Sequence, residues 1–115
     1  RRRGENISSY EGEAVLLEHR AVKEAAAVAV KAEEGGEDEV LVCLILEDGA
    51  EPPRPEDLLD YCTPRMPYFA VPRYIEYVTE IPTTPTAKIQ KHKLRDRGLS
   101  AATWDREAAG YKVRR

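Results

Sequence analysis

A single lysine, Lys88, ends a loop that carries two prolines and three threonines. The loop reads Ile-Pro-Thr-Thr-Pro-Thr-Ala-Lys over residues 81–88, and a basic segment follows it at once. Pro82 and Pro85 fix their own φ angles and withhold backbone donors, so residues 82–87 should form an ordered loop that presents Lys88 outward. An ammonium group in such a place is a mobile point charge suited to phosphate or carboxylate oxygens. Spacing alone leaves the alternative open that Lys88 is an ordinary solvated lysine.

The charges of the chain are unevenly distributed. Residues 33–39 carry five acids, whereas residues 88–97 carry five lysines and arginines against one aspartate. We interpret the acidic run as a solvated turn. The basic segment could be a solvated helix face, or it could add a positive field for a polyphosphate beside Lys88.

The length of 115 residues predicts one domain, residues 1–115, with a modest core. With 42% hydrophobic residues, 34% charged residues and a net charge of −3, the composition is that of an ordinary soluble globular chain with no strong attraction to nucleic acid. No apolar run approaches the roughly 20 residues of a membrane span, and no signal peptide opens the sequence. We therefore expect a cytoplasmic protein. Because the chain begins without a methionine, we interpret it as a domain of something longer.

The cysteine and histidine pattern does not predict a metal site. Cys43 lies in an apolar run and Cys62 in a predicted helix, with no Cys-x-x-Cys motif and no Cys/His pairing at ligand spacing. We expect two buried thiols in a reducing compartment. Packing or solvent exposure is enough to explain His19, His92 and Trp104.

The hydrophobic pattern predicts a small α+β domain, a three-stranded sheet packed with two to three helices. The predicted strands are residues 22–30, 40–46 and 74–78, the first two pairing across the acidic turn. The first is ambiguous, because three successive alanines favour a helix whereas the valines favour a strand. The predicted helices are residues 8–19, a segment from Pro55 that Pro64 should end, residues 91–97 closed by Gly98 in a left-handed conformation, and a last turn over residues 104–109 with Thr103 as its cap and Gly110 as its stop.

Two of these helices carry a stripe that should face the core. In the first helix the stripe is Ala14, Val15, Leu16 and Leu17, and in the second it is Leu58, Leu59, Tyr61 and Cys62.

Three segments stand in a distinctive order: Arg-Gly-Glu-Asn-Ile-Ser at residues 3–8, Pro-Tyr-Phe-Ala-Val-Pro-Arg-Tyr at residues 67–74, and Ile-Pro-Thr-Thr-Pro-Thr-Ala-Lys-Ile-Gln-Lys at residues 81–91. Together they resemble the carboxy-terminal domain of adenylate-forming enzymes, the superfamily of acyl-CoA synthetases, adenylation domains and luciferases. Residues 1–8, 36–40 and 91–95 look most like the branch that includes crotonobetaine/carnitine-CoA ligases.

The resemblance implies a mobile lid that works with a large amino-terminal domain. That domain, absent from this chain, would hold ATP with its Mg²⁺ and the acid. In the first half-reaction a carboxylate attacks the α-phosphate of ATP to give acyl-AMP and pyrophosphate, and in the second the CoA thiol displaces AMP. By resemblance, Lys88 is the catalytic lysine of adenylation. The same resemblance implies CoA contacts from two places, listed here: Gly4, Glu5 and Asn6 near the start, and Phe69 and Arg73 in the second motif.

The sequence departs from the family pattern at two points. The usual Ser/Thr-Gly-Lys is Thr86-Ala87-Lys88 here, which reduces backbone freedom before the lysine. The hinge residue that normally precedes the first motif is absent, because the chain starts too late. Without the large domain we expect this chain alone to be inactive.

Two alternatives belong to other functional classes. The first is a non-catalytic module that docks a partner protein through its sheet or its basic helix. The second is nucleic-acid binding through residues 1–3 and 91–97, against which the net negative charge argues.

Overall fold

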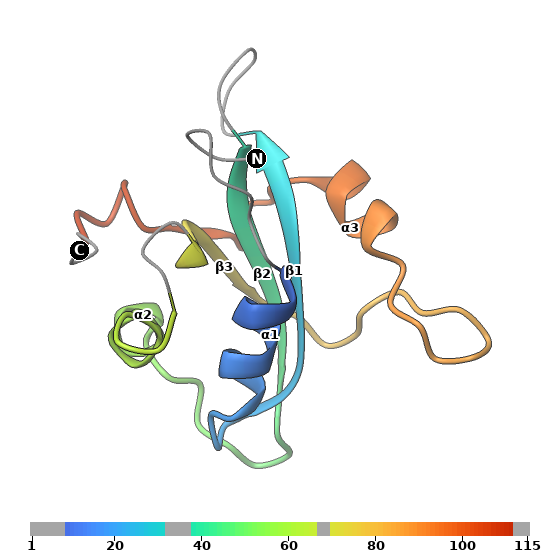
Figure 1. Ribbon diagram of the computed structural model, residues 1–115, viewed down its shortest axis with the longest axis horizontal. Coiled ribbons are helices and arrows are strands. Elements are labelled where there is room, and N and C mark those ends of the chain that lie inside the picture. Colours follow the sequence, from blue (N-terminus) through green and yellow to red (C-terminus); the bar gives the residue numbers. More distant parts are fainter. Residues whose placement is uncertain (1–8, 32–37, 67–69, 112–115) are drawn as a thin grey trace.

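The computed structural model describes residues 9–31, 38–66 and 70–111, and these residues form a small α+β domain, as predicted (Figure 1). In chain order the elements are α1 (Ser9–Leu17), β1 (Val22–Lys31), β2 (Asp38–Leu46), α2 (Pro55–Cys62), β3 (Tyr74–Tyr77), α3 (Lys91–Arg97) and β4 (Trp104–Asp105). Within these residues, none of the helices has the length and apolar character needed to cross a membrane.

The strands form one mixed sheet in the order β1-β2-β3-β4. β1 and β2 pair antiparallel, as predicted, with Val28 opposite Leu41. β2 and β3 pair in parallel, and α2 lies in the connection between them, as a parallel pair requires a crossover. β3 then pairs antiparallel with β4, a fourth strand that the sequence pattern did not predict.

The sheet is buried on both faces. On one face, side chains of α1 and α2 such as Leu16 and Leu58 join the inward side chains of the strands. On the other face Leu94 of α3 packs against a separate set of strand residues that includes Leu41 and Cys43. Figure 1 shows α3 well apart from α1 and α2. The two core clusters therefore place the helices on opposite faces of one sheet.

The alanine run of β1 is a strand, which resolves the ambiguity in the sequence. Ala25 and Ala27 belong to the core of one face, and Ala26 belongs to that of the other. The alternation is the period of two that a strand requires. Burial on both faces thus overrides the helix propensity of alanine.

The first helix turns only part of its predicted stripe inward. Leu16 is buried and Val15 packs against the core, but Ala14 is exposed and Leu17 is 47% exposed. The prediction was wrong for Ala14 and Leu17 because successive helical residues are rotated by about 100°, so four in a row cannot share one face.

The second helix follows its prediction more closely. It ends at Cys62, before Pro64, and buries Leu58, Leu59 and Cys62. The prediction was wrong for Tyr61, which is only half-buried. The centroids of its ring and the His19 ring lie 5.0 Å apart in an edge-to-face arrangement, and the Arg65 guanidinium lies 4.0 Å from the Tyr61 ring centroid.

The predicted last helical turn is not present. Trp104 and Asp105 form β4 opposite Ile75 and Tyr74, and turns follow over residues 106–110. Gly110 has φ +79° at the end of these turns. The pairing with β3 holds the segment extended, and two residues are too few to show a strand period in the sequence.

Candidate active site

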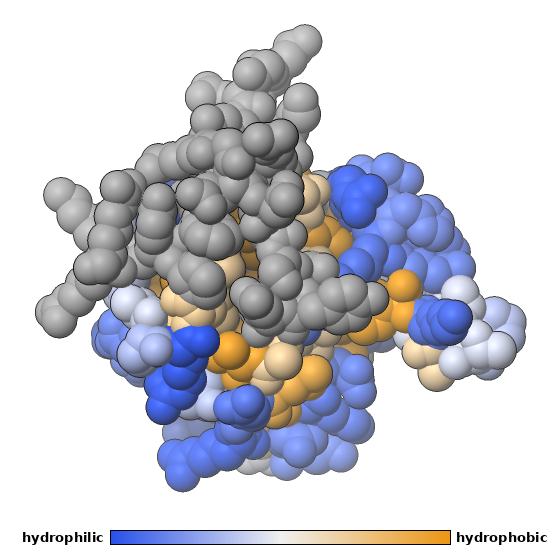
Figure 2. All heavy atoms as spheres, in the orientation of Figure 1, coloured by the Kyte–Doolittle hydropathy of each residue, from blue (hydrophilic) through white to orange (hydrophobic). Residues whose placement is uncertain are grey.

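The segment around Lys88 is a small hairpin. Thr83 and Ile89 pair in an antiparallel bridge, and the Gln90 N–H donates to the Pro82 carbonyl at 2.9 Å. The segment projects away from the sheet (Figure 1) and forms a weakly hydrophilic protrusion at one side of the molecule (Figure 2). The loop is therefore ordered, as the two prolines predicted.

Thr84 closes the tip of this hairpin. Its N–H donates to the Lys88 carbonyl at 2.8 Å, and its carbonyl accepts from the Ala87 N–H at 2.9 Å. Its Oγ1 accepts from the Lys88 N–H at 3.1 Å and lies 3.1 Å from Oγ1 of Thr86. The Thr84 hydroxyl thus satisfies the backbone N–H of Lys88 inside the loop.

Ala87 adopts the conformation in which a glycine would be expected. Its φ is +67°, and no other non-glycine residue in the described part of the chain has a positive φ. Placing a Cβ in this region costs about 1–2 kcal/mol. The hairpin therefore holds backbone strain directly before Lys88.

Lys88 itself is exposed. Among the described residues, no hydrogen bond or ion pair involves its ammonium group, whereas Lys91, three residues later, lies 2.7 Å from a Glu13 carboxylate oxygen. The structure thus presents Lys88 outward on an ordered support. An incoming anionic group would not have to displace a carboxylate of the described residues from this lysine.

The helix α3 begins directly after this hairpin. Leu94 anchors it in the core, and Gly98, with φ +66°, donates its N–H to the Leu94 carbonyl at 3.0 Å. Gly98 has the predicted positive φ, but its ψ of −148° lies outside the left-handed helical conformation that was predicted for the cap. Arg95 and Arg97 in the last turn have the charge that a helix carboxyl end favours.

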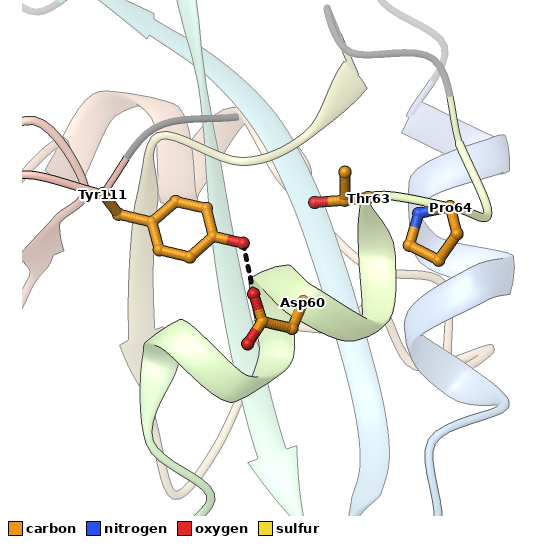
Figure 3. A pocket seen from close by; sticks show the side chains of 4 residues that line it. All are labelled: Asp60, Thr63, Pro64 and Tyr111. Atoms are coloured by element: carbon orange, nitrogen blue, oxygen red, sulfur yellow. Dashed lines mark hydrogen bonds between the residues drawn. The ribbon is translucent and has the colours of Figure 1, made fainter. Parts of the chain in front are cut away.

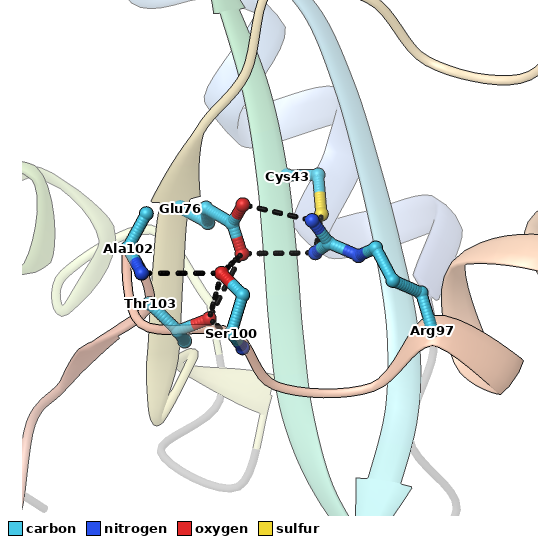
Figure 4. A network of polar contacts seen from close by, with 6 residues as sticks. All are labelled: Cys43, Glu76, Arg97, Ser100, Ala102 and Thr103. Atoms are coloured by element: carbon cyan, nitrogen blue, oxygen red, sulfur yellow. Dashed lines mark hydrogen bonds and ion pairs between the residues drawn. The ribbon is translucent and has the colours of Figure 1, made fainter.

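A buried carboxylate on β3, that of Glu76, binds Arg97, the last residue of α3 (Figure 4). Glu76 is 5% exposed, and its two oxygens accept from Nη1 and Nη2 of Arg97 at 2.8 and 2.9 Å. Thr103 and Ser100 donate their hydroxyls to the same carboxylate at 2.8 and 3.1 Å. Nη2 of Arg97 also donates to Sγ of Cys43 at 3.6 Å.

This network determines the charge state of Glu76. Burial is the largest single influence and opposes ionisation, but the hydrogen bonds from Arg97, Thr103 and Ser100 together outweigh it, so the pKa of Glu76 lies below its ordinary value. Arg97 is thereby held by an ionised partner. The sequence contained a signal for this contact: in β3 the period of two puts Glu76 on the same face as Tyr74, and a carboxylate on a buried face requires a cation.

Two hollows lie on opposite sides of the domain. One, of about 510 Å³, lies between the hairpin and α3; its lining residues are Val78, Glu80, Ile81, Pro82, Thr83, Lys93, Leu94 and Arg97. The other, of about 470 Å³, lies beside α2 (Figure 3) and is lined by Asp60, Thr63, Pro64 and Tyr111. In it the Tyr111 hydroxyl donates to Asp60 Oδ1 at 2.6 Å. The first hollow shares Pro82 and Thr83 with the Lys88 hairpin.

Of the residues predicted to contact CoA, the structure describes Arg73 alone. Its Nε and Nη2 donate to the two carboxylate oxygens of Asp105 at 3.1 and 3.4 Å, and Nε lies 3.6 Å from Glu107 Oε2. Its guanidinium also lies 4.9 Å from the centroid of the Tyr74 ring. Arg73 therefore links the start of β3 to β4. The other predicted CoA contacts, Gly4, Glu5, Asn6 and Phe69, lie outside the described residues.

No metal cluster is found in the described ranges. They contain no group of three or more histidine, cysteine, aspartate or glutamate side chains that could hold an ion. Cys43 and Cys62 are free thiols and buried, as predicted.

The family model of the AMP-binding enzyme C-terminal domain matches residues 11–88. The chain belongs to this family.

Proteins similar to this chain include several acyl-CoA ligases and an amide bond synthetase. The mitochondrial medium-chain acyl-CoA ligase of Danio rerio is 46% identical over 96 residues, which are 84% of this chain and 16% of that protein. The crystal structure of an acyl-CoA synthetase of Brucella canis has a TM-score of 0.75 and 35% identity over 82% of this chain and 18% of that one. An anthranilate CoA ligase in complex with anthranoyl-AMP has a TM-score of 0.78 and 33% identity over 85% and 19%. This chain thus spans less than a fifth of the length of these proteins.

Proposed function

We propose that this chain is the lysine-bearing lid domain of an ATP-dependent acyl-CoA ligase, and that Lys88 acts in the adenylation step. The observation that carries the proposal is the presentation of Lys88. The lysine is exposed on a hairpin closed by its own hydrogen bonds, in a chain that belongs to the AMP-binding enzyme C-terminal domain family. The acyl-CoA ligases that resemble this chain give the reaction class.

The proposed chemistry uses the positive charge of Lys88. When a carboxylate oxygen attacks the α-phosphorus of ATP, the new acyl–phosphate bond forms as the bond to pyrophosphate breaks, and negative charge redistributes over the phosphate oxygens. A placed ammonium group can lower such a barrier by about 3 kcal/mol or more. ATP, its Mg²⁺ and the acid would be held mainly by the large domain, which is the proposed partner of this chain.

The same lid would then serve thioester formation. The lysine must leave once acyl-AMP has formed, so it has to lie on an element that moves as a body, and the closed hairpin and α3 supply such an element. The CoA thiol would then attack the acyl carbon and expel AMP. For this step we keep Gly4, Glu5, Asn6, Phe69 and Arg73 as the proposed CoA contacts. Of these, Arg73 would have to exchange part of its contact with Asp105 for a CoA phosphate.

The identity of the carboxylic acid that is activated and the cellular location of the protein stay predictions. The motifs in residues 1–8, 36–40 and 91–95 favour the crotonobetaine/carnitine-CoA ligase branch, and composition favours the cytoplasm. The residues that would select the acid belong to the large domain. The sequence of that domain would therefore decide the substrate.

The test measures the two half-reactions separately in the enzyme that carries this domain. Lys88→Ala should abolish most acid-dependent exchange of pyrophosphate into ATP, while supplied acyl-AMP is still converted to thioester. Lys23→Ala, which removes an exposed lysine of β1 outside the basic segment, is the matched control and should keep both rates. Unchanged exchange in Lys88→Ala would refute the catalytic assignment and favour a non-catalytic interaction module.

A further inference from the structure

Two carboxylates hold α3, one at each of its ends; Glu76 is buried and Glu13 is partly buried. Lys91, the first residue of the helix, meets Glu13, and Arg97, the last, meets Glu76. Neither carboxylate belongs to the loop or helix that carries Lys88. Both are nevertheless in a position to fix the support on which Lys88 stands.

The contact at the start of α3 crosses the edge of the sheet. Glu13 lies on α1, which packs on the opposite face of the sheet from α3. Its Oε2 lies 2.7 Å from Nζ of Lys91 and accepts the Ala27 N–H of β1 at 2.7 Å. The side chain of Glu13 is 13% exposed, so solvent screens this pair only weakly. Glu13 therefore joins α1, the edge strand β1 and α3 at one oxygen atom.

The contact between Glu76 and Arg97 at the end of α3 has a more favourable geometry than the contact between Glu13 and Lys91. Glu76 and Arg97 form two parallel charge-assisted hydrogen bonds, the arrangement that fixes direction as well as distance. Ser100 and Thr103 occupy further acceptor sites of Glu76, so the chain directly after α3 is tied to the same carboxylate. The end of α3 is thus held against β3.

A short, bonded path connects α3 to Lys88. Gln90, which precedes the helix, donates its N–H to the Pro82 carbonyl at the base of the hairpin. Ile81 and Ile89, which flank the hairpin, pack in or against the same core cluster as Leu94. A shift of α3 would therefore move the base of the hairpin, and with it Lys88.

We infer that Glu76 and Glu13 are positioning residues for Lys88, acting through Arg97 and Lys91. The inference rests on the proposed function, because it concerns the rate of the step in which Lys88 takes part. Neither carboxylate touches the reacting atoms. Each fixes one end of the helix that carries the base of the lysine hairpin.

The experiment uses Glu76→Gln and Glu13→Gln in the full enzyme, because an amide keeps the shape and an acceptor oxygen while it removes the charge. Each variant is combined with Lys88→Ala. The matched control is Asp57→Asn on α2, which removes the charge from an exposed ion pair with Arg54 that has no link to α3. The readouts are the kcat and KM of acid-dependent pyrophosphate exchange, the rate of thioester formation from supplied acyl-AMP, and the folded fraction by circular dichroism.

A misplacement of about 1 Å can reduce a catalysed rate as much as 100-fold. We therefore expect the rate of pyrophosphate exchange to fall about 10-fold or more in Glu76→Gln and by a smaller factor in Glu13→Gln. The loss should appear in kcat and not in the KM for ATP. Thioester formation should stay within about twofold, and Asp57→Asn should change neither rate. In the Lys88→Ala background the two carboxylate substitutions should have no further effect on exchange, since a positioning residue needs the residue that it positions.

Equal losses in both half-reactions, or additive losses in the Lys88→Ala background, would overturn the inference and leave a merely structural role. If Glu76→Gln does not fold, Arg97→Lys keeps the charge but loses the bidentate geometry and gives the same test. Unchanged exchange in Lys88→Ala would instead contradict the proposed function itself. The failures of the two proposals are therefore distinguishable.

Discussion

The Glu13 carboxylate and the Lys91 ammonium group meet at the outer edge of β1, an edge strand of the sheet formed by the described residues, with Oε2 and Nζ 2.7 Å apart. They come from helices on opposite faces of the sheet. The same oxygen accepts the Ala27 N–H, a donor of the edge strand that would otherwise lack a ladder partner. One side chain therefore connects the two layers and covers part of an edge that could pair with another strand.

Removing the Glu13 carboxyl group should expose this edge. Glu13→Ala leaves the Ala27 N–H without its acceptor, so the free energy of unfolding should fall by about 1–3 kcal/mol. Glu13→Gln keeps an acceptor for the N–H and should lose less. Urea unfolding followed by circular dichroism measures both. Equal losses in the two variants would show that Ala27 gains nothing from the side chain.

Replacing Ala87 with glycine should stabilise the domain. Ala87 has φ +67°, so Ala87→Gly relieves backbone strain of about 1–2 kcal/mol. The greater freedom of the unfolded glycine chain opposes this by about 0.5–1 kcal/mol, which leaves a small net gain. The control is Ala101→Gly at an exposed turn residue without a positive φ, which should lose stability. A lower urea midpoint for Ala87→Gly would mean that the hairpin holds Ala87 in another conformation.

Glu76 should make stability depend on acid. Its folded-state pKa lies below the ordinary value of 4.5, so its contribution is fully present above that value and is lost as pH falls through the folded-state pKa. Wild type should therefore lose more stability than Glu76→Gln between about pH 5 and pH 3, with the two curves converging in acid. Asp105, whose pKa burial tends to raise but Arg73 and backbone donors lower, contributes in both proteins alike. Parallel curves would exclude an ionised, paired Glu76.

The two thiols should react only when the domain opens. Burial raises the pKa of Cys43, and it raises that of Cys62 to about 12, while both side chains are fully buried. A thiol without access or thiolate character reacts slowly, so labelling with an aromatic disulfide reagent at pH 8 should follow unfolding. Leu99→Cys, at a residue that is 41% exposed, adds a fast-reacting control thiol. Rapid labelling of wild type would contradict the burial of both cysteines.

The predictable part of the fold is the part with strong local signals. Residues 40–46 are a continuous apolar run bounded by turn residues, residues 91–97 are a basic segment closed by Gly98, and the structure has β2 and α3 there. β4 could not be predicted in the same way, because its two residues are extended by pairing with Ile75 and Tyr74 and by the contact between Arg73 and Asp105. Tertiary contacts decide such a segment, and a local pattern does not contain them.

In the candidate site, too, local features could be predicted from the sequence and features that depend on distant contacts could not. The prolines and threonines around Lys88 predicted an ordered loop, because their effects are local. The positive φ of Ala87 and the contact between Glu13 and Lys91 depend on residues far along the chain or on the closed hairpin. The role of Lys88 came from resemblance and stays a proposal.

The most direct test of the central claim measures two rates in Lys88→Ala, each relative to wild type: acid-dependent pyrophosphate exchange, and thioester formation from supplied acyl-AMP. The decisive quantity is the first relative rate divided by the second. A lysine that stabilises the adenylation transition state should lower this ratio by about 100-fold or more, the size of effect seen when one placed donor is removed from a catalytic site. A ratio near one, with either both rates kept or both lost together, would contradict the assignment of Lys88 to adenylation.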